Sequence, residues 1–186
     1  MHKKFCFIVF ILLAVVTAPL FAATVDGVTL PDTVELNGTN LVLNGMGTRK
    51  ATMFKVKVYV MGLYLTEKRD GAKAIMQSES PKRIVMRFVR DVGAKKIRDG
   101  WQTGFEKNSP DAAVLQGKID QFNAAMDDMK KGDEIQLDFA AGQVDVVING
   151  ENKATIEGVD FQRALLSIWL GPHPPNKALK AGILGK

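Results

Sequence analysis

The sequence contains very little cysteine and histidine, and this scarcity removes several kinds of chemistry. Its 186 residues include one cysteine, Cys6, and two histidines, His2 and His173. Cys6 lies in an N-terminal apolar run. Once that run is removed, no thiol is left for a disulfide, a thiolate metal site or a cysteine nucleophile. His173 alone cannot build a histidine-based triad or a multi-histidine metal site, so we expect no metal and no other cofactor.

Strong charge imbalance and nucleotide-binding motifs are also missing. Removing Lys3 and Lys4 from the 25 basic residues leaves 23 against 20 acidic residues, a net charge of +3. The two signs are interleaved along the chain, so we expect no nucleic-acid partner. No P-loop, no G-x-G-x-x-G after a strand and no calcium-loop spacing of carboxylates is found, which removes the common nucleotide-binding and hydrolase classes.

The first 23 residues have the three parts of a secretory signal peptide. A short basic start is followed by the apolar run Phe5–Val16 and then by small and helix-breaking residues. A run of about a dozen residues is too short for a bilayer core, which needs roughly 20, so a transmembrane anchor is the weaker interpretation. We predict a signal peptide over 1–23, cleaved after Ala22 or Ala23, and one domain over 24–186 without a stable membrane anchor.

Hydrophobic periodicity predicts an α+β domain with a mostly antiparallel sheet whose helices cover one face. Asn149-Gly150 is a strong hairpin signal, and Asp111 is a candidate helix cap. We expect strands at 28–30, 41–43, 54–65, 83–90, 134–139, 143–148 and 153–156, and helices within 70–79, 94–107, 111–132, 160–170 and 176–184.

Residues 54–65 give the longest strand signal, with the period-two alternation of a half-covered strand. This alternation places Tyr59 on the same face as Lys55 and Lys57. Arg49 comes just before, and its guanidinium can face a cavity between sheet and helices. Along one straight strand Arg49 and Tyr59 would be about 33 Å apart at roughly 3.3 Å per residue. They can act together only if the chain folds back near residues 50–53.

Each candidate also has a purely structural interpretation. An arginine at a strand start is often a surface or capping residue, and a strand tyrosine is often half-buried packing. Trp101 and Asn108 lie seven residues apart on one helix face, and ordinary core packing produces the same spacing.

Four motifs follow one another along the chain, and together they extend from about Val25 to Gly185. They are Gly45-x-Gly47-x-Arg49, Val58-Tyr59-Val60-Met61-Gly62-Leu63-Tyr64-Leu65, Trp101 followed by Gly104-Phe105-x-x-Asn108, and Leu165-Leu166-Ser167-Ile168-Trp169-Leu170-Gly171 before a proline-rich break. Their order resembles the chalcone isomerase-like family, specifically its exported bacterial branch. The resemblance implies an open-faced β-sandwich, a large antiparallel sheet covered by a layer of helices with a ligand cleft between them. In a Gram-negative host it implies a periplasmic protein, and otherwise a secreted one.

The resemblance also implies roles for individual residues. The plant enzymes of this family add a phenolate oxygen to an enone and so close chalcone to flavanone. Arg49 is similar to the arginine that holds the substrate oxyanion, Asn108 matches the helix asparagine, and Ser167 falls near the late hydroxyl residue. If the protein is an enzyme, these three are the catalytic candidates. Tyr59 stands where the plant enzymes have threonine, and Trp101 stands where they have tyrosine, which argues against the plant reaction.

The combination of Arg49 with Tyr59 is similar to the noncatalytic fatty-acid-binding members of the family. There the pair grips a carboxylate and apolar walls cover the alkyl chain. We therefore expect a small hydrophobic ligand, such as a fatty acid, bound by Arg49, Tyr59, Trp101, Asn108 and Ser167. Two alternatives stay open: an intramolecular lyase or isomerase acting on a chalcone-like phenolic, and a noncatalytic envelope interaction protein. The sequence leaves the oligomeric state undetermined.

Overall fold

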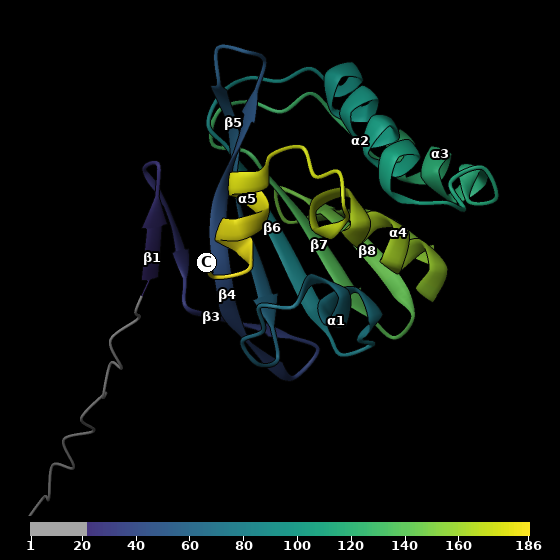
Figure 1. Cartoon of the computed structure of the whole chain (residues 1–186), viewed down its shortest axis with the longest axis horizontal. Coiled ribbons are helices and arrows are strands. Elements are labelled where there is room, and N and C mark those ends of the chain that lie inside the picture. Colours follow the sequence, from purple (N-terminus) through teal and green to yellow (C-terminus); the bar gives the residue numbers. More distant parts are fainter. Residues whose placement is uncertain (1–21) are drawn as a thin grey trace, which may run out of the picture.

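The computed structural model describes residues 22–186, in which one seven-stranded sheet is accompanied by a two-stranded hairpin and five helices (Figure 1). The elements are β1 (Ala22–Val25), β2 (Val28–Pro31), β3 (Thr33–Leu36), β4 (Thr39–Ala51), β5 (Val56–Leu65), α1 (Ala72–Gln77), β6 (Lys82–Phe88), α2 (Ala94–Asn108), α3 (Gln116–Ala124), β7 (Glu134–Ala140), β8 (Gln143–Ile148), β9 (Glu151–Glu157), α4 (Val159–Leu170) and α5 (Lys177–Ile183). The predicted signal peptide lies outside the described residues except for Ala22 and Ala23, which begin β1, and its cleavage stays a prediction.

The seven-stranded sheet is an antiparallel meander in which sequence neighbours are also neighbours in space, in the order β3 to β9. The predicted hairpin signal at Asn149-Gly150 joins β8 to β9, and both residues have positive φ, 50° and 84°. These are the angles that a two-residue type I′ turn requires. The α+β class and the antiparallel sheet covered by helices are therefore confirmed.

The strand β5 is covered on both faces, which corrects the expectation of a half-covered strand. All seven residues from Tyr59 to Leu65 are buried. Met61 belongs to the main core beneath the helices, whereas Val60 belongs to a smaller cluster with Leu30 and Leu36 on the opposite face. The reason is that the segment before β4 folds back over the sheet and covers a face that alternation alone leaves to solvent.

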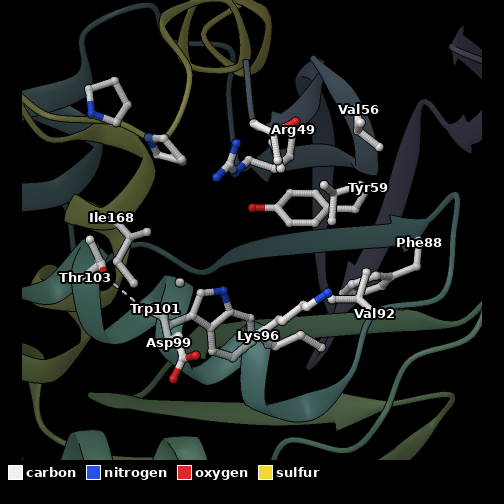
Figure 2. Close-up of a pocket in the computed structure, with 18 of the residues that line it drawn as sticks. Arg49, Val56, Tyr59, Phe88, Val92, Lys96, Asp99, Trp101, Thr103 and Ile168 are labelled. Carbon is white, nitrogen blue, oxygen red and sulfur yellow. Dashed lines mark hydrogen bonds between the residues drawn. The ribbon is translucent and has the colours of Figure 1, made fainter. Parts of the chain in front are cut away.

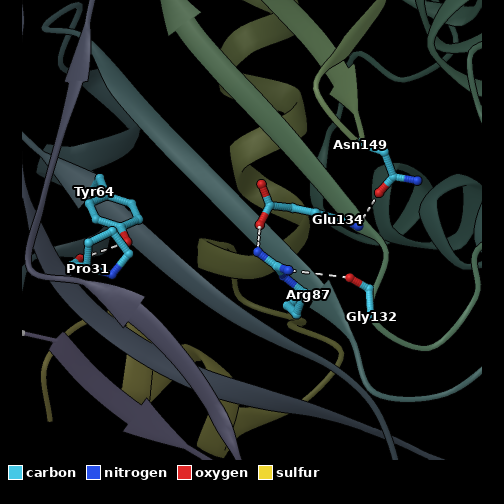
Figure 3. Close-up of polar contacts among 6 residues, drawn as sticks. All are labelled: Pro31, Tyr64, Arg87, Gly132, Glu134 and Asn149. Carbon is cyan, nitrogen blue, oxygen red and sulfur yellow. Dashed lines mark hydrogen bonds and ion pairs between the residues drawn. The ribbon is translucent and has the colours of Figure 1, made fainter.

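Polar contacts on this opposite face hold the N-terminal segment and the strand ends in place (Figure 3). The Tyr64 hydroxyl donates to the backbone oxygen of Pro31 at 2.9 Å. Arg87 pairs with Glu134 at 2.5 Å, and the Glu134 backbone N–H donates to the Asn149 side chain at 2.9 Å. Burial, with a smaller contribution from the Glu134 charge, raises the pKa of Tyr64 to about 12. Tyr64 therefore stays neutral and keeps its hydrogen bond at neutral pH.

The helices lie on the other side of the sheet, where α2, α4 and α5 surround the core (Figure 1). The helix predicted over 111–132 is shorter than expected and spans only Gln116–Ala124. Asp111 does not cap it, because residues 110–115 form turns, and Met129 exchanges backbone hydrogen bonds with Val92 at 2.8 and 2.9 Å. In residues 22–186 no helix has the combination of length and apolar character that crossing a bilayer requires.

Candidate functional site

The hairpin formed by β4 and β5 brings Arg49 and Tyr59 together. The chain turns back through residues 52–55, where the Lys55 N–H donates to the Thr52 oxygen at 3.1 Å. Arg49 and Tyr59 are direct partners in the antiparallel register of the two strands. The reversal expected near residues 50–53 is therefore confirmed. Because of it, Arg49 and Tyr59 are separated only by the short distance between neighbouring strands.

A β-bulge at this point aims Tyr59 at the helices. Arg49 pairs with Tyr59 and Lys50 pairs with Lys57, so Val58 has no partner. An unmatched residue shifts the alternation of the strand by one position. Lys57 consequently faces away and pairs with Asp26 at 2.5 Å, whereas Val58 and Tyr59 both line the cavity described below. The expectation that Tyr59 shares a face with Lys57 is wrong for this reason.

The glycines before Arg49 allow α5 to lie directly on β4. Gly45, Gly47 and Arg49 alternate along the strand and so point to one face. A Cβ atom on Gly47 would lie 2.8 Å from the backbone oxygen of Leu179 in α5, and one on Gly45 would clash with the backbone of Gly182. This close approach brings Asn176, the residue that precedes α5, beside Arg49.

Asn176 fixes the position of the Arg49 side chain. Arg49 Nη1 donates to Asn176 Oδ1 at 3.1 Å and also to the backbone oxygen of Lys50. The same Asn176 oxygen accepts the Lys50 backbone N–H at 2.8 Å, so this side chain does not cap α5 as the sequence suggests. No carboxylate in residues 22–186 forms an ion pair with Arg49. Its positive charge is therefore oriented but not neutralised by the described part of the chain.

Tyr59 is held by a buried hydrogen bond that leaves its own proton available. The indole Nε1 of Trp169 in α4 donates to the Tyr59 hydroxyl oxygen at 2.9 Å. Because an indole N–H is only a donor, the Tyr59 hydroxyl is the acceptor here and its O–H is free to donate elsewhere. Burial raises the pKa of Tyr59, while the Trp169 bond and the Arg49 charge oppose that rise. Figure 2 shows the Tyr59 hydroxyl and the Arg49 guanidinium on the same side of the cavity.

A cavity of about 790 Å³ lies between the hairpin, α2 and the loop after α4. This volume is within the range of roughly 300–1,000 Å³ that small-molecule sites occupy. Trp101 in α2 is only 5% exposed and stacks on Phe122 with ring centroids 4.6 Å apart. Figure 2 shows the indole nitrogen of Trp101 facing the cavity. The apolar walls are formed by Val56, Val58, Phe88, Val92, Ile97, Trp101, Ile168, Pro174 and Pro175.

The charges around the cavity are predominantly positive. The charged lining residues are the cations Arg49, Arg90, Lys96 and Lys107 and the carboxylates Asp91 and Asp99. Each carboxylate is paired with a lysine outside the lining, Asp91 with Lys130 at 3.4 Å and Asp99 with Lys95 at 2.7 Å. A cleft lined by one sign of charge attracts ligands of the other sign. The cavity therefore favours an anion over a cation.

Two of the five predicted ligand-binding residues, Asn108 and Ser167, are not part of the cavity lining. Asn108 Nδ2 donates to the backbone oxygens of Gly104 and His173 at 3.0 and 3.1 Å, and its Oδ1 accepts the His173 N–H at 2.8 Å. The Ser167 hydroxyl donates to the Ala164 oxygen at 2.6 Å within α4. Asn108 thus anchors the loop that carries two proline walls of the cavity, and Ser167 bonds to its own helix. Contact of either residue with a ligand stays a prediction.

Two important site residues have no distinct sequence signal. Trp169 looks like one more apolar residue on the core face of α4, and only the structure shows its bond to Tyr59. Asn176 looks like a helix cap, and only the structure shows its bond to Arg49. Residues 22–186 contain no cluster of three or more His, Cys, Asp or Glu side chains suited to a metal ion.

A family model described as chalcone isomerase-like matches residues 22–185. Among solved structures, a fatty-acid binding protein from Arabidopsis thaliana is similar, with a TM-score of 0.70 at 16% sequence identity, covering 88% of this chain and 96% of that one. No curated protein sequence matches significantly. At this identity the structural likeness shows a shared fold.

Proposed function

This chain belongs to the chalcone isomerase-like family, and on that premise we propose that it binds a small hydrophobic carboxylate, such as a long-chain fatty acid, in the cavity between sheet and helices. One observation carries the proposal. The oriented guanidinium of Arg49 and the free hydroxyl proton of Tyr59 lie side by side in a cavity whose walls are largely apolar. The fatty-acid binding protein with the same fold supports it.

The part of the cavity at Arg49 and Tyr59 suits a carboxylate because the guanidinium and the hydroxyl both donate hydrogen bonds. A guanidinium stays charged and offers N–H donors in a planar fork, and charge-assisted bonds of this kind are the stronger ones. Tyr59 stays protonated because burial raises its pKa, so it adds a neutral donor without adding negative charge. A carboxylate bound here would accept from both and would neutralise the Arg49 charge.

The rest of the cavity suits an alkyl chain. Valine, isoleucine, phenylalanine, tryptophan and proline side chains make up the walls. Contact with an apolar ligand removes these surfaces from water, which lowers the free energy of the complex. The cations Lys96 and Lys107 raise the local concentration of anions near the cavity. In this arrangement the carboxylate lies at Arg49 and Tyr59, and the chain runs along Trp101 and Val92.

Calorimetric titration with a long-chain fatty acid and with its methyl ester tests the proposal. The wild-type protein is expected to bind the acid more tightly than the ester, because the ester has no charge for Arg49. Arg49→Ala is expected to weaken binding of the acid by about 10- to 150-fold, the equivalent of about 1.5–3 kcal/mol for a bond to a charged group. Tyr59→Phe removes one neutral donor to the carboxylate, together with the acceptor of the Trp169 N–H, and is expected to weaken binding of the acid by a smaller factor.

Two further variants separate local contacts from net charge. Lys57→Ala removes a positive charge from the same strand, but Lys57 faces the opposite side and pairs with Asp26, so affinity for the acid is expected to stay unchanged. Arg49→Lys keeps the charge and loses the fork, and we expect an intermediate affinity. Equal affinity for acid and ester, or equal losses in Arg49→Ala and Lys57→Ala, would contradict the proposal.

We also propose that the protein is exported and belongs to the exported bacterial branch of the family, with a periplasmic or secreted location. The support is the basic, apolar and small-residue pattern of residues 1–23. Intact-mass measurement of the protein isolated from its native host tests this proposal. We expect an N-terminus at Ala23 or Thr24, and retention of Met1 to Ala22 would refute it.

A further inference from the structure

The turn between β4 and β5 carries an unusual pair of exposed apolar side chains. Met53 is 86% exposed and Phe54 is 83% exposed. Thr52, next to them, has a φ of 61°, in the left-handed region that a β-branched residue rarely adopts. Such a backbone conformation is strained and tends to occur where function requires a particular shape. The turn thus presents two large apolar groups to solvent and holds them in a defined conformation.

This tip is continuous with the cavity. The neighbouring residues Ala51, Thr52 and Val56 belong to the cavity lining. Figure 1 shows the β4–β5 hairpin projecting past the other strands at the end of the sheet nearest α2. A surface that contacts the tip would therefore lie beside the cavity.

Unpaired cations lie on the tip and along the cavity beside it. Lys55 follows the two apolar residues and is exposed, and the cavity lining adds Arg90, Lys96 and Lys107, all three exposed. None of these four side chains forms an ion pair with a described carboxylate. Exposed apolar side chains next to a cavity lined by unpaired cations match a bilayer surface that carries anionic headgroups, because the apolar groups reach the acyl region while the cations stay at headgroup level.

We propose that the β4–β5 tip, with Met53 and Phe54 at its end, docks the protein on an anionic lipid bilayer and places the cavity at the membrane surface. Only two side chains of the tip, Met53 and Phe54, enter the bilayer, and they insert only into its outer layer. A protein partner would be expected to cover a larger apolar patch, since a specific interface buries on the order of 800 Å² on each side. Docking rests on the tip and its charges, and it does not depend on which ligand occupies the cavity.

Flotation of the mature purified protein with lipid vesicles, with its N-terminus at Ala23 or Thr24 so that the apolar run Phe5–Val16 cannot bind lipid, tests the proposal, with no fatty acid added. One set of vesicles contains phosphatidylcholine alone, and the other contains one third phosphatidylglycerol. We expect the wild-type protein to float with the anionic vesicles, to float far less with the neutral ones, and to be released by high salt. The double variant Met53→Ser, Phe54→Ser is expected to lose about tenfold or more in its vesicle partition coefficient, because two apolar side chains no longer leave water.

Val114→Ser is the matched control. Val114 is 85% exposed, like the tip residues, but it lies in the connection between α2 and α3 and does not line the cavity. Its partition coefficient is expected to equal that of the wild type. Three results would overturn the proposal: no flotation with anionic vesicles, equal losses in the control and in the tip variant, or a self-association of the wild type that disappears in the tip variant without any vesicle binding. Because binding of a fatty acid is measured separately, failure of docking leaves the proposed function untouched.

Discussion

Replacing Gly47 with alanine tests whether the packing of α5 on β4 controls the binding site. The new Cβ atom would lie 2.8 Å from the Leu179 backbone oxygen and 3.0 Å from its Cδ1 atom, where ordinary contact begins at 3.4 Å. The backbone oxygen cannot rotate away as the end of a side chain can. The helix α5 must therefore move outward by about 0.6 Å to restore ordinary contact.

This movement affects stability and the site together. Overpacking of this kind destabilises the folded protein by about 1–3 kcal/mol, and the reduced freedom of the unfolded chain offsets about 0.4–1 kcal/mol of that. We therefore expect the free energy of unfolding to fall by about 0.5–2 kcal/mol. The bond from Arg49 Nη1 to Asn176 is already 3.1 Å long. A further 0.6 Å, as estimated above, takes it past the limit of a hydrogen bond. The Arg49 side chain then loses its orientation, and affinity for a long-chain carboxylate is expected to fall several-fold.

Urea unfolding and ligand titration of Gly47→Ala measure the two effects. Gly117→Ala is the control, because a Cβ atom at Gly117 in α3 meets nothing within 4 Å. Alanine there is expected to stabilise the protein by up to about 1 kcal/mol and to leave ligand affinity unchanged. If Gly47→Ala were as stable as the wild type and bound the ligand equally well, the coupling between α5 and Arg49 would be refuted.

Three other predictions concern stability and ionisation. Asn108→Ala removes the hydrogen bonds to the loop after α4, and chemical unfolding is expected to show a free energy of unfolding lower by about 1–3 kcal/mol. A decrease below about 0.5 kcal/mol would argue against this anchoring role. Arg83 binds Asp138 through hydrogen bonds of 2.5 and 2.8 Å, so Arg83→Ala leaves the Asp138 carboxylate buried without its cation. We expect the same assay to show a free energy of unfolding lower by about 3–5 kcal/mol. A decrease below about 1 kcal/mol, which is typical of an exposed ion pair, would contradict this expectation. Burial raises the pKa values of Tyr59 and Tyr64, so their contribution to stability is complete below about pH 10, the ordinary pKa of tyrosine, and is lost at higher pH. For Tyr64, whose pKa is raised to about 12, this loss extends toward pH 12. An absorbance titration should show no tyrosinate in the folded protein near pH 10.

Much of the fold follows from the sequence because its strands and turns carry local signals. The three strands β7 to β9 and their hairpins were expected from alternation and from glycine turns, and all three are present. The helix α2 was also expected, from apolar spacing at Ile97, Trp101 and Phe105. These elements bury one face each, which is the case in which periodicity is informative.

The features that local signals could not give depend on contacts between distant segments. Residues Thr39 to Ala51 form the longest strand of the described chain, yet Asn44, Gly45 and Gly47 interrupt its strand signal. Those glycines are present because α5 lies against them, a contact between segments more than 130 residues apart. The reversal between Arg49 and Tyr59 was expected, whereas the bulge that aims Tyr59 depends on the pairing register.

The most direct measurement is a crystal structure of the protein grown with a long-chain fatty acid. We expect the two carboxylate oxygens to lie within hydrogen-bond distance of the Arg49 guanidinium and the Tyr59 hydroxyl, with the alkyl chain beside Trp101. A carboxylate located at Lys96 or Lys107, with the alkyl end at Arg49, would contradict recognition of the carboxylate by Arg49 and Tyr59. An acid bound outside the cavity would contradict it as well.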